Sequence, residues 1–262
     1  MFFRNIYLAF YLFFRLSLAA LISVSMDNTV PTHPDGNPKI YLWSSIATFN
    51  SDLSDGQIVA IAEDGYKSML QGAFANNYEE QMPFVMTALA HKVENGPTTV
   101  YLASSAKGSG SLVYKVTKYM NKPCNGAVWG RVPNSLKNAL DTCKNDLSTS
   151  AKQHQFDAKC GEMNALLEVY ASTQIDPRSM GGHFRIVTWQ GRYTDTGIYR
   201  GGRIKAPCWK DDGIGCSDTL EALTFDMDVI KTQRESYANN MPVSVTSQGI
   251  FRSEVSRAQS RG

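Results

Sequence analysis

Three cysteines and one glutamate are the residues of this sequence best suited to chemistry. Cys160 and Glu162 are separated by one residue at the start of a helix-like segment, and Cys208 and Cys216 precede a second such segment. Cysteine thiolates bind zinc, and zinc with three protein ligands keeps a fourth position open for a water that is acidic enough to attack at neutral pH. A glutamate beside such a site can carry protons. If Cys160 and Cys216 lie at helix N-termini, the helix dipole favours their thiolate forms.

The order of these residues is similar to the motif of a known enzyme superfamily. The chain resembles the cytidine deaminase-like superfamily of zinc-dependent nucleobase deaminases. The resemblance lies in the order of four features: Cys-x-Glu, a β-like run, Pro-Cys…Cys and a further helix. The resemblance rests on Cys160, Glu162, Pro207, Cys208 and Cys216. It implies that the three cysteines hold zinc and that Glu162 shuttles protons between the zinc-bound water, which is the nucleophile, and the base. The implied reaction is hydrolytic deamination of a cytosine- or adenine-type base in a nucleoside, nucleotide or nucleic acid. The implied fold is α/β, a three-layer α/β/α sheet that starts with a β-hairpin.

The cysteine spacing departs from the commoner pattern of that superfamily. Cys208 and Cys216 form Cys-x7-Cys where Cys-x2-Cys is commoner, so a loop must return the second sulfur to the metal. Gly213 and Gly215 supply the flexibility for such a return. Fungal proteins and secreted toxin-type deaminases with a wide spacing look like the nearest relatives. Two alternatives stay open. One is a secreted effector or binding protein that keeps the fold without catalysis, and the other is a metal-free domain in which a Cys208–Cys216 disulfide clips a surface loop.

The N-terminal residues 1–25 predict a secretory signal peptide. The segment is apolar and contains no acidic residue, and its uninterrupted apolar core at 16–24 is too short to span a bilayer. No later apolar run has spanning length, so we expect a secreted chain without a membrane anchor after cleavage. Loss of Arg4 and Arg15 lowers the formal net charge from +2 to about zero. A chain of that charge lacks the broad basic surface that grips long nucleic acid non-specifically.

Secretion constrains the use of the five cysteines, because cysteines in an oxidising compartment pair or bind metal. If three of them bind zinc, Cys124 and Cys143 are left to form a disulfide that closes a modest loop. Two disulfides and one free thiol satisfy the same count. The arithmetic therefore supports zinc without establishing it.

The remaining pattern predicts one principal domain. We expect a lead-in segment at 26–53, a deaminase-like domain at 54–240 with an insertion at about 122–155, and a C-terminal tail at 241–262. Helical periodicity and β-like runs place the expected elements as follows: a helix at 54–72, a hairpin from 84–90 and 100–103, a helix at 160–170, a central strand at 184–189 and a strand at 227–230. Helix, hairpin and Cys-x-Glu helix, in that order, match the deaminase core.

Residues that contact the substrate are not assigned by any motif. Arg200 and Arg203 lie among glycines ahead of Pro207, and a solvated loop is the default interpretation; the alternatives are that they bind phosphate or offset the negative charge of a zinc tris-thiolate. Trp209 could stack on a base or pack beside the loop. The sequence contains no nucleotide-binding glycine fingerprint in the right context and no Ser-His-Asp pattern. Oligomeric state is not predicted.

Overall fold

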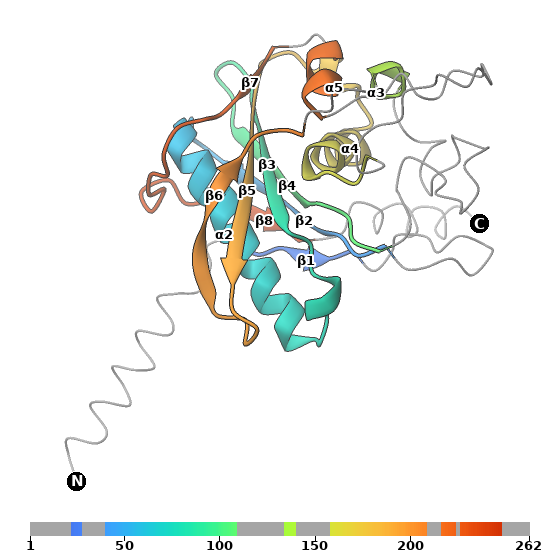
Figure 1. Cartoon of the computed structure of the whole chain (residues 1–262). Helices are drawn as coiled ribbons and strands as arrows, with labels where there is room; N and C mark the ends of the chain where they lie inside the picture. Colours follow the sequence, from blue (N-terminus) through green and yellow to red (C-terminus); the bar gives the residue numbers. More distant parts are fainter. Residues whose placement is uncertain are drawn as a thin grey trace, which may run out of the picture.

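The computed structural model describes residues 22–27, 40–108, 134–139, 158–208, 216–223 and 226–247. They form an eight-stranded sheet in the order β1-β2-β4-β3-β5-β6, with β7 paired to β5 and β8 paired to β2 (Figure 1). The strands are β1 (Ser25–Met26), β2 (Trp43–Phe49), β3 (Val85–Lys92), β4 (Thr98–Ser104), β5 (His183–Tyr193), β6 (Tyr199–Lys205), β7 (Met227–Val229) and β8 (Ser244–Thr246). The α-helices are α2 (Asp55–Ala75), α3 (Asn134–Ala139), α4 (Gly161–Thr173) and α5 (Cys216–Ala222). Short 3-10 helices span Glu79–Gln81 and Pro177–Ser179. The predicted α/β class is confirmed at this level.

Helix α2 begins at a complete capping box. The Ser54 hydroxyl accepts from the Gln57 N–H, and the Gln57 side chain accepts from the Ser54 N–H at 2.9 Å, so two backbone donors of the first turn are satisfied. Its apolar residues recur at helical spacing and face β3 and β5. The helix predicted for 54–72 is therefore confirmed, and it continues to Ala75.

The predicted hairpin is β3 and β4, which pair antiparallel with Leu89 opposite Tyr101. Asn95 has a positive φ of 53° in the connecting turn. On its other side β3 pairs antiparallel with β5, the predicted central strand, with Thr87 opposite Thr188. The β5–β7 pair is parallel and follows the crossover through α5. These central strands bring the segments before α4 and α5 to the same region of the sheet.

Two hydrophobic clusters lie on opposite faces of the sheet. Successive side chains of β3 alternate between them: Leu89 packs with α4, and its neighbours Ala88 and Ala90 pack with α2. Figure 1 shows α2 on one side of the strands and α4 with α5 on the other. The cysteines belong to the cluster on the α4 face, and the residues of α2 pack in the cluster on the other face of the sheet.

Several boundaries differ from the sequence-based expectation. β2 lies inside the expected lead-in segment and pairs with β4 over its length, and β8 lies inside the expected tail and pairs with β2. Upstream, Ile22 is fully buried and the Val24 N–H donates to Ser68 Oγ at 3.0 Å, so the predicted cleavage point after Ser25 falls inside β1. Signal cleavage itself stays a prediction. Within the described ranges, no helix has both the length and the apolar character needed to cross a membrane.

Candidate metal centre

Cys160, Cys208 and Cys216 converge from three separate segments. Their sulfur atoms all lie within 4.8 Å of one another, and the Cys160 and Cys208 sulfurs are 3.5 Å apart. Three thiolates on one tetrahedral zinc, with Zn–S bonds of about 2.3 Å, place their sulfurs about 3.8 Å apart. The spacing therefore fits a single ion with a fourth position free. All three are free cysteines in the structure, so the alternative Cys208–Cys216 disulfide is not formed.

Helix termini place two of these ligands. Cys160 is the N-cap residue of α4 and has extended backbone angles (φ −65°, ψ 150°), and Cys216 is the first residue of α5. The Cys216 N–H donates to Cys208 Sγ at 3.1 Å, and the Ser217 N–H donates to the Cys208 carbonyl at 3.0 Å. The start of α5 thus closes onto Cys208 and returns Cys216 to the cluster, as Cys-x7-Cys requires. Residues 209–215 of that loop, including the base-stacking candidate Trp209, lie outside the described residues.

The pKa values of Cys160 and Cys216 are both raised. The neighbouring Cys208 thiol is the main cause that raises the pKa of Cys160, and burial is the main cause that raises the pKa of Cys216. These effects favour the thiol forms of Cys160 and Cys216 and act against the helix dipole. A bound metal deprotonates a coordinating thiol outright. Three clustered thiols, two of them with raised pKa values, are a donor set that a metal ion can convert into ligands.

Glu162 is the second residue of α4, two residues after Cys160, and its side chain is only 4 % exposed. Thr188 Oγ1 of β5 donates to Glu162 Oε1 at 2.8 Å, and Thr87 Oγ1 of β3 lies 2.7 Å from Thr188 Oγ1. Burial raises the pKa of Glu162, while its own backbone N–H and Thr188 oppose the shift. The result is a buried carboxyl with a raised pKa, as suits a group that takes up and releases a proton.

Gly161, between the ligand and the glutamate, allows α4 to approach the sheet closely. A Cβ at this position would collide with Thr87 Oγ1 and would lie 3.2 Å from the Ala103 carbonyl. Because Gly161 fills so little space, the first turn of α4 sits directly on β3 and β4. This contact brings Glu162 within reach of Thr188.

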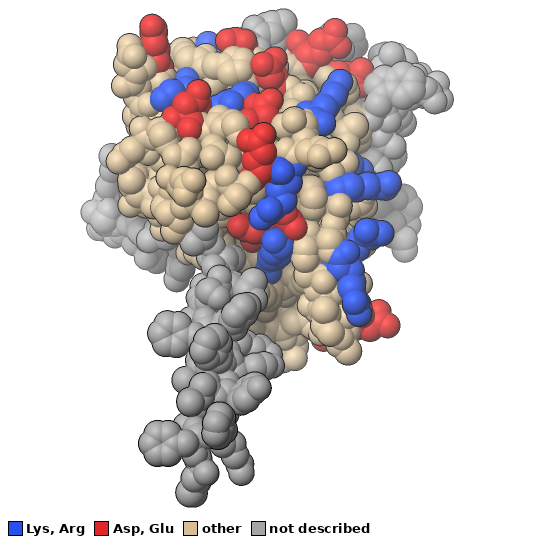
Figure 2. Space-filling view, turned by 90° about the vertical axis from the view of Figure 1, so that its left-hand side faces the viewer, with Lys and Arg blue, Asp and Glu red and all other residues tan. Residues whose placement is uncertain are grey.

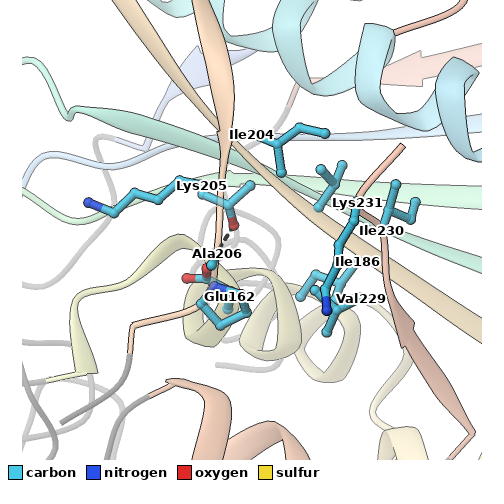
Figure 3. Close-up of a pocket in the computed structure, with 11 residues that line it drawn as sticks. Glu162, Ile186, Ile204, Lys205, Ala206, Val229, Ile230 and Lys231 are labelled. Atoms are coloured by element: carbon cyan, nitrogen blue, oxygen red, sulfur yellow. Dashed lines mark hydrogen bonds between the residues drawn. The ribbon is translucent and has the colours of Figure 1, made fainter. Parts of the chain in front are cut away.

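A cavity of about 290 Å³ opens beside Glu162 (Figure 3). Its walls are mainly aliphatic, and Figure 3 shows Lys205 and Lys231 on opposite sides of it. The residues that line it are Glu162, Ile186, Val187, Thr188, Ile204, Lys205, Ala206, Pro207, Val229, Ile230 and Lys231. The volume suits one small ring rather than a drug-sized ligand.

The structure brings together four of the five residues that carry the motif, Cys160, Glu162, Cys208 and Cys216, and the fifth, Pro207, lines the cavity beside Glu162. The expected Cys124–Cys143 disulfide lies outside the described residues. Sequence reasoning missed Thr87 and Thr188, although each is a threonine inside an apolar strand, which is the available signal. It also missed Lys205 and Lys231, whose position depends on strand pairing.

Comparison with known proteins finds no matching family model, no matching curated protein and no matching solved structure. The functional assignment therefore rests on the cysteine cluster, Glu162 and the cavity beside them.

Proposed function

We propose that this chain is a secreted, zinc-dependent hydrolytic deaminase of the cytidine deaminase-like superfamily, with that superfamily's three-layer α/β/α arrangement. One observation carries the proposal: a three-cysteine cluster lies beside a buried glutamate, and that glutamate lines a base-sized cavity. The order of helix α2, the β3–β4 hairpin and then α4 supports it. The substrate is a cytosine- or adenine-type base.

The roles of the residues follow from their positions. Zinc held by the three cysteines would supply an acidic water. Glu162 would carry two protons of this water in turn: one to the ring nitrogen, and the second, released by the new hydroxyl group on the ring carbon, to the leaving amine. The new bond joins the water oxygen to the ring carbon, the carbon–nitrogen bond to the amine breaks, and ammonia leaves. Thr188 holds Oε1 of Glu162, so Oε2 is the oxygen available to the reacting groups.

The cavity walls fit the expected substrate. Ile186, Ile204 and Val229 present aliphatic surfaces that can contact the two faces of a flat base. Burial removes competing water from the carboxyl of Glu162, because the side chain is only 4 % exposed. Glu162 has the only carboxyl among the described residues that line the cavity.

Metal content and ammonia release test the proposal together. Wild-type protein purified without chelator is expected to contain one zinc per chain, and Cys208→Ser is expected to lose it. Glu162→Gln is expected to keep zinc and to lose ammonia release from cytosine- or adenine-containing substrates by a factor of at least about 100. Glu94→Gln, an exposed glutamate of the β3–β4 turn, is the matched control and should match wild type.

Two results would overturn the proposal. Absence of zinc from the wild-type protein removes the catalytic site. Bound zinc without ammonia release from any base tested leaves a non-catalytic effector or binding protein on this fold.

A further inference from the structure

The edge strand β6 carries basic side chains without ion pairs. Arg200, Arg203 and Lys205 are exposed, as is Lys231 across the cavity, and none of them has an acidic partner among the described residues. Four other described cations are ion-paired, namely Lys67, Arg178, Arg185 and Arg234. From His183 to Lys205 the sequence contains one acidic residue, Asp195, in the turn between β5 and β6. The strand therefore presents uncompensated positive charge.

These cations lie on the sheet face that carries Glu162. Lys205 is opposite Thr188, whose hydroxyl holds Glu162, and Arg203 is opposite Gln190 on the same face. The Arg203 guanidinium donates to Gln190 Oε1 at 3.4 Å, which confirms the side. At about 3.4 Å per residue, Arg203 lies about 7 Å beyond Lys205, and Arg200 lies farther along the strand, past the register shift between Gly191 and Tyr193. The charges form a row that leads away from the cavity.

The opposite face of β6 packs against α2 and makes hydrogen bonds to neighbouring residues. Tyr199 donates to Glu63 of α2 at 2.8 Å and accepts from Trp189 Nε1 at 3.1 Å. Gly191 packs directly against the Tyr66 ring, where a Cβ would collide with it. On the Glu162 side, no described helix packs on β6. Figure 2 shows several Lys and Arg side chains gathered on one part of the molecular surface.

We propose that the substrate of this site is a single-stranded nucleic acid whose backbone runs along β6, with the target base in the cavity beside Glu162. The inference rests on the proposed function, since that function places a base in the cavity. A mononucleotide needs cations only at the cavity, where Lys205 and Lys231 lie; Arg200 and Arg203 reach beyond it. A base can enter such a cavity only when it is unpaired and unstacked.

The number of basic side chains along β6 and at the cavity also predicts how binding depends on salt. Four cations that contact phosphates of a single strand give a salt dependence with a slope of about −2.8 in log–log terms, or roughly a 50-fold loss of affinity between 50 and 200 mM salt. A site of this size covers few nucleotides, in keeping with a chain whose net charge is only +2. The protein would therefore contact only a short stretch of the nucleic-acid strand.

Fluorescence anisotropy tests the inference independently of turnover. A dye-labelled single-stranded oligonucleotide of about 12 nucleotides is titrated with full-length Glu162→Gln protein, with Arg200→Gln and Arg203→Gln added together in the test variant. We expect the added pair to weaken binding about tenfold or more at 50 mM salt and to reduce the slope by about 1.4. Competition by cytidine and adenosine monophosphates should not change.

The matched control removes the same charge elsewhere. Lys92→Gln with Arg178→Gln, added to the same background, alters cations near the other end of β5, because Lys92 is opposite His183. Equal weakening by both pairs, or an oligonucleotide that binds no better than a mononucleotide, would overturn the inference. Strand binding that depends on β6 without ammonia release from wild type would uphold this surface and reject the deaminase proposal alone.

Discussion

Glu162 is oriented by hydroxyl groups from two strands. Thr188 has one O–H, which it donates to Glu162 Oε1, so the 2.7 Å contact with Thr87 must be a hydrogen bond that Thr87 donates. This chain of hydroxyls fixes one carboxyl oxygen and the rotation of the group. A carboxyl that gives and takes a proton during one reaction needs such a fixed orientation, because the proton must move along a short path each time.

Thr188→Val removes the hydrogen bond and keeps the shape of the side chain. We expect kcat for ammonia release to fall about 10- to 100-fold with KM and zinc content nearly unchanged, since loss of an orienting partner around a metal site has this effect. Thr188→Ser restores the hydroxyl and should recover most of the activity. Steady-state kinetics of the three proteins decide the matter, and a wild-type kcat for Thr188→Val would contradict the positioning role of Thr188.

At the scale of elements, the approach of α4 to β3 sets the distance between Glu162 and the sheet. The contact point is Gly161 against Thr87. Glycine near the start of a helix is unfavourable by propensity, with a penalty of about 1 kcal/mol relative to alanine in a helix interior. Its presence here is explained by the space available, because any side chain would push the helix start away from the strand.

Gly161→Ala is therefore expected to destabilise the protein by about 1–3 kcal/mol despite the better helix propensity of alanine. It should also lower kcat, because Glu162 moves with the helix. Gly72→Ala in α2 is the control: the nearest atom to its Cβ would be Trp43 Nε1 at 3.8 Å, so we expect equal or greater stability. Urea denaturation gives both values. If the two alanine variants have the same stability, close packing at Gly161 does not matter.

The elements that the sequence predicted are those with a local signal. Helix α2 has a cap and a 3.6-residue period, the β3–β4 hairpin has Asn95-Gly96-Pro97, and β5 is rich in aromatic and β-branched residues. Strand β6 was expected as a solvated loop because Arg200 and Arg203 flank two glycines. Gly202 is in fact required by a strand contact, since a Cβ there would lie 2.5 Å from Trp189 Nε1. Pairing between distant strands leaves no comparable local pattern.

In the candidate site, too, some residues could be predicted from the sequence and others could not. Residue type and order were enough to select Cys160, Glu162, Cys208 and Cys216, because zinc ligands and a proton carrier are chemically distinctive. The cavity wall could not be predicted, because it depends on the register that places Lys205 opposite Thr188 and on the return of β7. A shift by one residue would send Lys205 to the α2 face.

For the whole molecule, a buried acid in the α4 cluster links stability to pH. Glu168 is 1 % exposed, and neither of its carboxyl oxygens has a hydrogen-bond partner among the described residues. Burial, and then the negative charge of Asp27, raise the pKa of Glu168 well above its ordinary value. The folded protein thus keeps this carboxyl protonated at pH values where the unfolded chain has released the proton.

Stability should therefore fall as the pH rises above the ordinary carboxyl pKa. The unfolded chain then binds one proton fewer than the native state, so this group contributes a slope of up to about −1.4 kcal/mol per pH unit until the pH passes the folded pKa. Glu168→Gln has no ionisable group and should show a flatter profile in urea denaturation between about pH 5 and 8. The exposed Glu221→Gln is the control. Parallel profiles for Glu168→Gln and wild type would show that Glu168 ionises in the folded state.

The three cysteines also join parts of the chain that are weakly connected otherwise. Cys160 belongs to α4, Cys208 follows β6, and Cys216 starts α5, a helix of seven residues that is too short to persist without tertiary contacts. Metal that binds only the folded cluster stabilises it by mass action, about 3–4 kcal/mol at 100 to 1,000 times Kd. The benefit should be greatest at α5, because two of the three ligands meet at its start.

Removal of the metal by a chelator should accordingly lower the unfolding temperature. The amides of α5 should then exchange with solvent hydrogen before those of α2, because α2 belongs to the hydrophobic cluster on the opposite face of the sheet. Cys208→Ser should behave like the chelated protein and respond no further to chelator. Glu162→Gln should keep the wild-type response, because the glutamate is not a ligand. Exchange followed by mass spectrometry separates the two helices. Protection of α5 that is indifferent to chelator would mean that the sulfur cluster holds no structural metal, whatever ion copurifies with the chain.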